Sequence, residues 1–304
     1  MAELSDLKKQ YGFGWIREYP DFRDYTPSTQ QVAALFAQSK ATGVLGSPQA
    51  AERAPATLPS SVDLRSWFSD VDDQDGLGSC TAHAADSIVE YYEKRAFGGY
   101  IDISRLFVYK VTRDLLGWSG DTGAYIRTTM GTLALVGAPP EKYWLYDPQR
   151  FDEEPPAFVY SLAQNYRATA YFRLDGPGMT TNALLDRIKL FVAAGFPPMF
   201  GFTVYTCIWQ AGTTGLIPFP APGDTAFAGH AIAVAGYDDS LKIKNAAPGA
   251  TETTGALLIK NSWGKGWGAQ GYGWFPYEYV LQGLAVDWWS ILKETWVATG
   301  QFGF

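Results

Sequence analysis

The stretch Gln74-Asp75-Gly76-Leu77-Gly78-Ser79-Cys80 decides the fold. Apolar residues recur at helical spacing from Thr81 to Ala96, so a helix is expected to begin at Cys80, with Ser79 as its cap. The unpaired N–H groups and the positive dipole end of that helix favour a thiolate. A buried and inert cysteine is the competing interpretation, because a reactive thiol also needs a base. The charged residues assigned to the opposite, polar face of the helix are Asp86, Glu90, Glu93 and Lys94.

A base is easy to seek, because the chain has only two histidines. His230 lies in Ala228-Gly229-His230-Ala231-Ile232-Ala233-Val234-Ala235-Gly236-Tyr237, which is typical of a buried strand. The next apolar run, Ala256-Leu257-Leu258-Ile259-Lys260, predicts another strand that ends at Asn261-Ser262-Trp263-Gly264. Asn261 could hold one nitrogen of the His230 ring so that the other faces Cys80, and Trp263 could screen that hydrogen bond from water. A histidine that only satisfies a backbone carbonyl is the alternative.

Three motifs occur here in the order Gln-x-x-x-x-Ser-Cys, Gly-His-Ala and Asn-Ser-Trp-Gly. In that order they resemble the motifs of the papain-like cysteine peptidases, and the resemblance runs from Leu58 to the C-terminus. It implies a two-lobed α+β fold, with a helical lobe, a β-barrel-like lobe and the active-site groove between them. The residues around Cys80 resemble the bacterial and archaeal branch of the family. Two positions depart from the usual pattern, because Thr81 replaces a tryptophan and Leu77 replaces a disulfide cysteine.

The resemblance also implies a role for each site residue. Cys80 would be the nucleophile, His230 its acid/base partner and Asn261 the residue that orients the imidazole. Gln74 and the Cys80 N–H would form the oxyanion hole. Gly123 matches a glycine that pairs with the substrate backbone. The pocket for the side chain before the cleaved residue would be lined by Ala124, Tyr125, Phe202, Ala228 and Ala231, and Trp263 would also contact substrate.

The function implied is hydrolysis of peptide bonds by a cysteine-type endopeptidase through an acyl-enzyme, with peptides or proteins as substrates and no cofactor. That pocket favours apolar or aromatic side chains, since no acidic residue is evident in it. Two other functions stay open. The chain could be a catalytically silent, peptide-binding member of the fold, or a thiol-dependent transferase that joins peptides to amines.

Composition excludes several other classes of function. The chain has 304 residues, 47% of them hydrophobic and 18% charged, which allows a sizeable core. A net charge of -7 without a basic cluster argues against nucleic acid. Residues 191–209 are apolar but interrupted by Gly195 and Pro197-Pro198, so they predict a helix end, a turn and a strand rather than a membrane span. The first ten residues lack the apolar core of a secretory signal, which leaves the compartment open.

The remaining thiol and imidazole have simpler interpretations. Cys207 is expected to be a packed, free thiol, because a bond to Cys80 would destroy the nucleophile. His83 and Cys80 make at most half a zinc site, so no metal is expected. A helix-surface or locally hydrogen-bonded histidine is the better account of His83.

The chain divides into a leader, residues 1–57, and a catalytic body, residues 58–304. The body is predicted to be helical over about 58–170 and rich in strands over about 171–304. The leader begins with an aromatic, charged stretch, and an Ala/Gln/Ser-rich run to Thr57 follows that is typical of a linker. A solvated tail would expose the apolar surfaces of Trp15, Ile16, Phe22 and Tyr25 to water. We therefore expect the leader to cover the groove as an inhibitory pro-segment, or to pack behind the body as scaffold.

Overall fold

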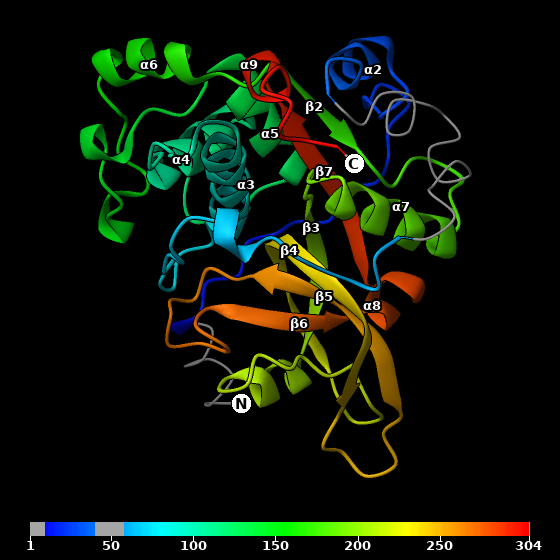
Figure 1. Cartoon of the computed structure of the whole chain (residues 1–304). Helices are drawn as coiled ribbons and strands as arrows, with labels where there is room; N and C mark the ends of the chain where they lie inside the picture. The colour runs from blue at the N-terminus through cyan, green and yellow to red at the C-terminus, as the bar shows by residue number, and fades with distance from the viewer. Residues whose placement is uncertain (1–9, 40–57, 304) are drawn as a thin grey trace.

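A computed structural model describes residues 10–39 and 58–303 of the chain (Figure 1). Several helices gather around the central helix α3, which lies against strand β4 of a curled sheet, while α7 and α8 lie on the right of the view and contact β4 and β5. The α-helices are α2 (Gln30–Phe36), α3 (Cys80–Phe97), α4 (Arg105–Leu115), α5 (Ile126–Leu135), α6 (Ala157–Ala163), α7 (Thr181–Ala193), α8 (Tyr277–Leu281) and α9 (Glu294–Val297). The strands are β1 (Ser61–Asp63), β2 (Ala170–Arg173), β3 (Met199–Tyr205), β4 (Ala226–Lys244), β5 (Glu252–Lys260), β6 (Tyr272–Pro276) and β7 (Ala285–Leu292).

The sheet has the strand order β2-β7-β3-β4-β5-β6, with β1 paired to β4 outside this path. All its named strand pairs are antiparallel. The predicted strands around His230 and before Asn261 are therefore confirmed as parts of β4 and β5. Ala233 pairs with Lys260, so the two neighbouring strands bring His230 and Asn261 to the same part of the sheet.

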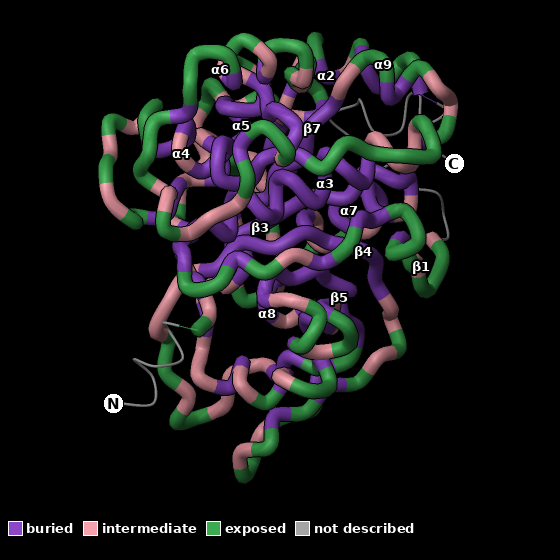
Figure 2. Tube along the Cα trace, turned by 90° about the vertical axis from the view of Figure 1, so that its left-hand side faces the viewer, coloured by how far each residue is buried: buried purple, intermediate pink, exposed green. Residues whose placement is uncertain are grey.

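Helix α3 begins at Cys80, as its periodicity predicts, but its polar face is not exposed. Every residue from Cys80 to Tyr92 is buried, Asp86 and Glu90 included, and α3 runs through the buried centre in Figure 2. The prediction of an exposed charged face is therefore wrong for Asp86 and Glu90. The physical reason is that burial raises the pKa of both carboxyl groups, which favours their neutral forms, and that the buried Lys260 lies near both.

Part of the run expected to be linker forms helix α2. Val32, Leu35 and Phe36 recur at helical spacing and are buried. The Phe36 ring makes edge contacts with Phe172, Phe191 and Phe196 at centroid distances of 5.5, 5.7 and 5.1 Å. This helix therefore attaches the leader to the body through apolar contacts. Residues 40–57, the rest of the expected linker, lie outside the described residues.

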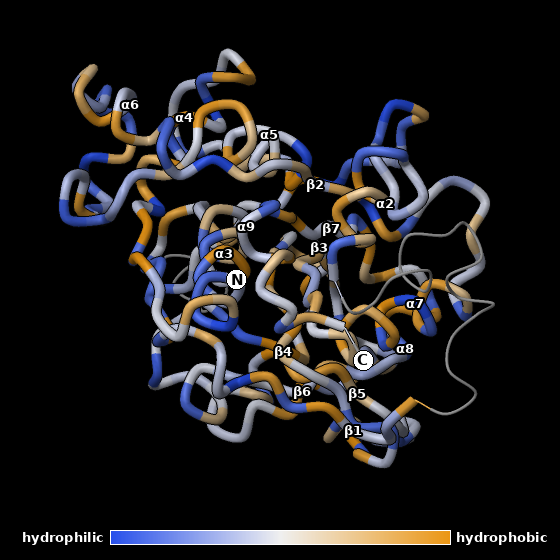
Figure 3. Tube along the Cα trace, turned by 45° about the horizontal axis from the view of Figure 1, so that its top comes forward, coloured by the Kyte–Doolittle hydropathy of each residue, from blue (hydrophilic) through white to orange (hydrophobic). Residues whose placement is uncertain are grey.

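The segment before Trp209 folds as its sequence predicts. Helix α7 ends at Ala193, the chain turns, and β3 begins at Met199. Hydrophobic and hydrophilic positions alternate along α7 in Figure 3, as expected of a helix with one buried face. No helix within residues 10–39 and 58–303 is long and apolar enough to cross a membrane.

The C-terminal part of the chain returns to the helical side. Strand β7 packs against α5 and α3, and α9 contacts α3 and α2. Helices α7, α8 and α9 also follow residue 170, so helices and strands both occur in the later half of the chain. The division into lobes near residue 170 stays a prediction.

The buried Glu90 generates a prediction about stability and pH. Burial raises the pKa of Glu90 from 4.5 to about 8, while the amide N–H of Ile103 donates to its Oε1 at 3.2 Å. An acid whose pKa is raised on folding binds its proton more tightly in the folded state, so the free energy of unfolding should fall as the pH rises between these two values. Glu90→Gln keeps an acceptor for Ile103 and cannot ionise, so its stability should fall less over this range. Urea denaturation at several pH values measures both slopes, and parallel slopes would contradict the buried, ionisable Glu90.

Candidate active site

Cys80 is the first residue of α3 and is fully buried. Ser79 occupies the N-cap position, but its side chain makes no capping hydrogen bond, so this part of the prediction is wrong. The Ser79 hydroxyl instead bonds to the Tyr146 hydroxyl at 2.8 Å and lies 3.3 Å from His83 Nδ1. A tertiary contact with Tyr146 thus replaces the local cap.

The His230 imidazole is held by one nitrogen only. Its Nε2 lies 2.8 Å from Asn261 Oδ1, which also accepts from the Ser262 N–H at 2.9 Å. Because this oxygen can only accept, Nε2 carries the proton and Nδ1 is left with a lone pair. Nδ1 is buried and has no hydrogen-bond partner in the described part of the chain. The Trp263 ring stacks on the imidazole at 4.6 Å, which shields the His230–Asn261 bond from water.

The Gln74 amide is fixed on both sides. Ser262 Oγ donates to its Oε1 at 2.5 Å, and its Nε2 donates to the Leu77 carbonyl at 2.8 Å. Its backbone N–H donates to the Ser262 carbonyl at 2.9 Å. The motif that contains Cys80 and the motif that contains Asn261 are therefore tied together directly, through Gln74 and Ser262.

The leader crosses this site as an extended chain. Trp15 forms a parallel bridge with Ala124, in which the Ala124 N–H donates to the Gly14 carbonyl at 2.8 Å and the Ile16 N–H donates to the Ala124 carbonyl at 3.2 Å. On the other wall, the Trp15 N–H donates to the Gly229 carbonyl at 3.3 Å. The leader backbone is thus bonded to both sides of the groove, one residue before His230 on the β4 side.

Close approach of the two backbones depends on glycine. A Cβ on Gly14 would lie 1.9 Å from the Gly78 carbonyl oxygen, and one on Gly12 would lie 2.5 Å from Gln74 Nε2. Gly123, in the left-handed region at φ 73°, leaves room for the Gly14 carbonyl, which would lie 2.1 Å from a Cβ there. The leader backbone therefore fits because Gly12 and Gly14, and Gly78 and Gly123 opposite Gly14, lack side chains.

The aromatic side chains of the leader cover the imidazole. The Phe13 ring makes edge contacts with His230 at 5.8 Å and with Trp263 at 5.4 Å. The Tyr11 ring lies 4.9 Å from Trp263, whose Nε1 donates to the Gly12 carbonyl at 3.4 Å. Together these groups remove His230 from solvent, and its exposed fraction is 0%.

The Trp15 side chain fills a recess that the sequence did not reveal. Its indole ring occupies the space that Cβ atoms on Gly201 and Gly229 would take, and its Nε1 donates to Asp287 Oδ2 at 3.0 Å. Asp287 lies 86 residues after Gly201 in the chain, but β7 pairs directly with β3, and Gly201 lies opposite Val286, so the two residues are close in space. The glycines in β3 and beside His230 were the available signal for a deep recess; nothing local marked Asp287.

Burial suppresses the charges of the thiol and the imidazole in this state. It raises the pKa of Cys80 to about 11, an effect that backbone hydrogen bonds from Ala231, Gly14 and Trp15 only partly offset. It lowers the pKa of His230 to about 4. The thiolate expected from the helix terminus is therefore not the favoured form while the leader is in place, because desolvation outweighs the helix dipole.

The predicted substrate-binding residues lie around the groove in different ways. The backbone of Ala124 pairs with the leader, whereas the Gly123 N–H bonds to the Tyr109 hydroxyl at 3.1 Å. The Phe202 ring lies 5.8 Å from His230 and is 1% exposed, so it supports the imidazole from the core. Ala231 is buried opposite Gly201, Ala228 pairs with Val204, and the Tyr125 ring packs on Trp118 at 5.4 Å.

The second thiol and the second histidine are both buried and hydrogen-bonded. Cys207 is free, as predicted, and its Sγ donates to the Pro218 carbonyl at 3.5 Å. His83 is buried, and its Nδ1 lies 3.1 Å from the Ser79 carbonyl, so the locally hydrogen-bonded interpretation holds and the surface one is wrong. The described residues contain no group of three metal-ligating side chains.

Comparison with known proteins identifies the family. The family model for "Papain family cysteine protease" matches residues 58–280. The chain belongs to this family. It is 32% identical to an uncharacterized peptidase C1-like protein of Acanthamoeba polyphaga mimivirus over 93% of this chain and 87% of that protein.

Solved structures agree with this assignment. Xylellain, a cysteine protease from Xylella fastidiosa, is 30% identical with a TM-score of 0.71, over 94% of this chain and 97% of that one. Digestive procathepsin L 3 of Tenebrio molitor is 20% identical with a TM-score of 0.59, over 96% of this chain and 86% of that one, which supports the fold. The two-lobed papain-like α+β fold and the cysteine peptidase class expected from the sequence are confirmed.

The recess around Trp15 generates a prediction about access to Cys80. Trp15→Ala removes a buried indole, a change that typically costs about 3–5 kcal/mol, and so should raise the alkylation rate of Cys80 by about 10² or more. Mass spectrometry after timed iodoacetamide treatment measures the rate, with Cys207 as an internal reference. Phe22 is 91% exposed, so the expectation that this leader residue is covered is wrong. Phe22→Ala is therefore the matched control and should change nothing. Equal rates for Trp15→Ala and the wild type would show that the leader does not limit access.

Proposed function

We propose that this cysteine peptidase is an endopeptidase that cleaves peptide bonds with a Cys80–His230–Asn261 triad. The observation that carries the proposal is the half-satisfied imidazole: Nε2 is held by Asn261 at 2.8 Å, while Nδ1 is buried without a partner. An imidazole oriented in this way can take the thiol proton at Nδ1 and later give it to the leaving amine. The leader supports an endopeptidase, because a continuous chain passes through the groove without ending there.

The oxyanion hole in this proposal consists of the Gln74 side-chain amide and the Cys80 N–H. Ser262 holds the oxygen of that amide, so its NH₂ group faces away from Ser262 and can donate. With the leader in place the NH₂ group donates to the Leu77 carbonyl, and the Gly12 backbone lies against it. Substrate would occupy this space after the leader leaves.

The triad is tested by substitution in protein whose leader has been displaced. Cys80→Ser and His230→Ala should each abolish hydrolysis of a fluorogenic peptide, since each removes one member of the thiolate–imidazolium pair. Gln74→Ala should lower kcat by about 10²-fold, the usual loss for one oxyanion donor. Asn261→Ala should be milder than His230→Ala, because the imidazole remains.

The outcomes distinguish the roles. Full activity in Cys80→Ser or His230→Ala would refute the triad, and an unchanged kcat in Gln74→Ala would place the oxyanion hole elsewhere. Equal losses for Asn261→Ala and His230→Ala would give Asn261 a role beyond orientation. Product masses measured with an added amine separate hydrolysis from transfer, the function that uses the same acyl-enzyme.

We further propose that the leader restrains the enzyme. Three observations support this: its backbone is bonded to both walls of the groove, its aromatic rings cover His230, and burial raises the pKa of Cys80 to about 11. It is also attached to the body away from the groove. Helix α2 packs on Phe172, and Arg127 of the body donates to Asp24 of the leader at 2.6 Å.

Gly14→Ala tests the restraint in the full chain. The added methyl group cannot fit 1.9 Å from the Gly78 oxygen, so the leader should leave the groove and peptide hydrolysis should rise by about 10-fold or more, toward the rate of a chain that begins at Leu58. Gly99→Ala is the matched control, because a Cβ there meets nothing within 4 Å. If Cys80 alkylation accelerates in Gly14→Ala while hydrolysis does not, the leader covers the thiol without restraining the enzyme.

A further inference from the structure

The recess that holds Trp15 combines a flat, deep space with one polar group at its end. Gly201 and Gly229 leave room for the indole, since Cβ atoms there would lie 1.9 Å and 2.9 Å from ring carbons. Asp287, with an exposed fraction of 0%, accepts the indole N–H at 3.0 Å. Trp15 itself is only 7% exposed, so the ring is enclosed and its single donor is satisfied.

The two carboxylate oxygens of Asp287 have different partners. Oδ1 accepts from Trp289 Nε1 at 2.7 Å and pairs with Arg173 Nη1 at 3.1 Å. Oδ2 receives the indole of Trp15. Asp287 has a left-handed backbone at φ 63°, near the point where the β3–β7 register shifts, and its N–H donates to Asp175 Oδ2 at 2.8 Å. Oδ1 is thus committed to the body, and only Oδ2 is presented to the recess.

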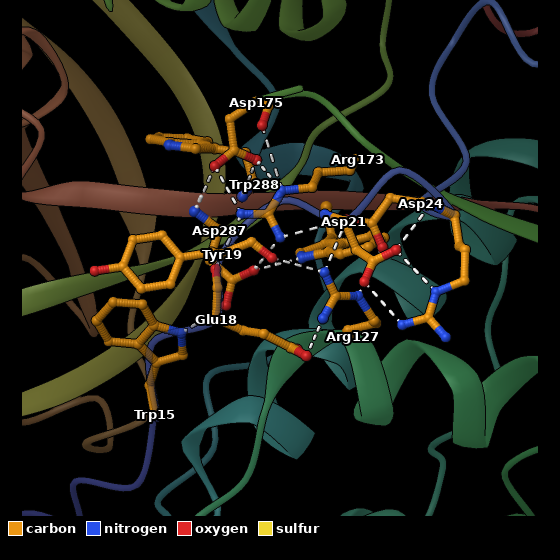
Figure 4. A network of polar contacts seen from close by, with 12 residues as sticks. Trp15, Glu18, Tyr19, Asp21, Asp24, Arg127, Arg173, Asp175, Asp287 and Trp288 are labelled. Carbon is orange, nitrogen blue, oxygen red and sulfur yellow. Dashed lines mark hydrogen bonds and ion pairs between the residues drawn. The ribbon is translucent and has the colours of Figure 1, made fainter. Parts of the chain in front are cut away.

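The charges around Asp287 favour a neutral donor over a cation. Figure 4 shows the network, in which Arg127 and Arg173 of the body face the leader acids Glu18 and Asp24. When the leader leaves, these two acids leave with it. Arg127 and Arg173 then stand against Asp175 and Asp287, which is a balanced set. An incoming guanidinium would meet Arg173 beside Asp287, whereas a neutral N–H satisfies Oδ2 without adding charge.

We propose that this recess is a substrate subsite that selects tryptophan, and that Asp287 is the residue that determines this specificity. The inference rests on the proposed peptidase function and on displacement of the leader from the groove. It also revises the expectation of a purely apolar pocket. The tryptophan N–H satisfies the buried Asp287 acceptor. A side chain of the same shape without an N–H leaves that acceptor unpaired and is therefore a poorer substrate.

The experiment uses the full chain with Gly14→Ala and Trp15→Ala, which unseats the leader and empties the recess. The substrates are fluorogenic peptides that differ only at one position, the residue that precedes the one whose carbonyl is attacked. That residue is tryptophan, its isostere 3-benzothienylalanine with sulfur in place of N–H, or arginine. The kcat/KM for tryptophan should exceed that for the isostere by about 10-fold or more, as for a hydrogen bond to a charged group, and should also exceed that for arginine. Burial raises the pKa of Asp287 to about 6, so assays above neutral pH keep it ionised.

Asp287→Asn in the same background is the near-isosteric test. Trp289 Nε1 donates to the Oδ1 position and the positive charge of Arg173 lies 3.1 Å from it, so the amide oxygen should remain there and the NH₂ group should face the recess. Two donors then oppose each other, and the preference for tryptophan over benzothienylalanine should fall to about one or reverse. Hydrolysis of benzothienylalanine peptides reports whether the variant is folded and active.

Each outcome decides the matter. Equal kcat/KM for tryptophan and its isostere, a preference for arginine, or an unchanged ratio in Asp287→Asn would overturn the specificity while leaving the peptidase function intact. If no peptide in the series is hydrolysed although Cys80 is readily alkylated, the proposed function fails, and the subsite with it.

Discussion

The structure depends on the packing of α3, a helix buried from Cys80 to Tyr92, against strand β4. This contact brings the first residue of the helix, Cys80, into the part of the molecule that contains His230, although 150 residues separate them in the chain. The cost is that Asp86 and Glu90 are buried with the helix, where Lys260 partly compensates for their charge. Lys260 immediately precedes Asn261, so the residue that balances the buried acids also adjoins the residue that holds the imidazole. The segment Lys260-Asn261 therefore contributes both to the stability of the buried helix and to the geometry of the site.

The leader adds a second constraint. Backbone bonds to both walls of the groove require glycine on both sides, and Gly12, Gly14, Gly123 and Gly229 meet this requirement. The consequence is electrostatic as well as steric. A buried thiol and a buried imidazole each prefer the neutral form, so the covered site favours Cys80–SH and neutral His230 over the ion pair. Covering the groove thus reduces nucleophilicity in addition to blocking the space.

The sequence alone predicts the helices, strands and turns that depend on local residue patterns. The start of α3 at Cys80, the strands around His230 and before Asn261, and the turn between α7 and β3 follow from periodicity and from Gly and Pro. Features set by distant contacts were not accessible in this way. Ser79 does not cap α3, because its hydroxyl bonds to Tyr146. Asp86 is buried near Lys260, and the pairing of β7 with β3 brings Asp287 to the Trp15 recess. In each case the deciding partner is far away in the chain and carries no local signature.

The central claim is that the seated leader holds Cys80 as a neutral thiol. The most direct measurement is a titration of thiolate absorbance, or of the pH dependence of alkylation, in a Cys207→Ser background with and without Gly14→Ala. The full chain should titrate with a Cys80 pKa of about 11, and the variant with the unseated leader should titrate at a clearly lower pH. Superimposable titration curves would contradict the account, because they would mean that the leader does not control the ionisation of the nucleophile.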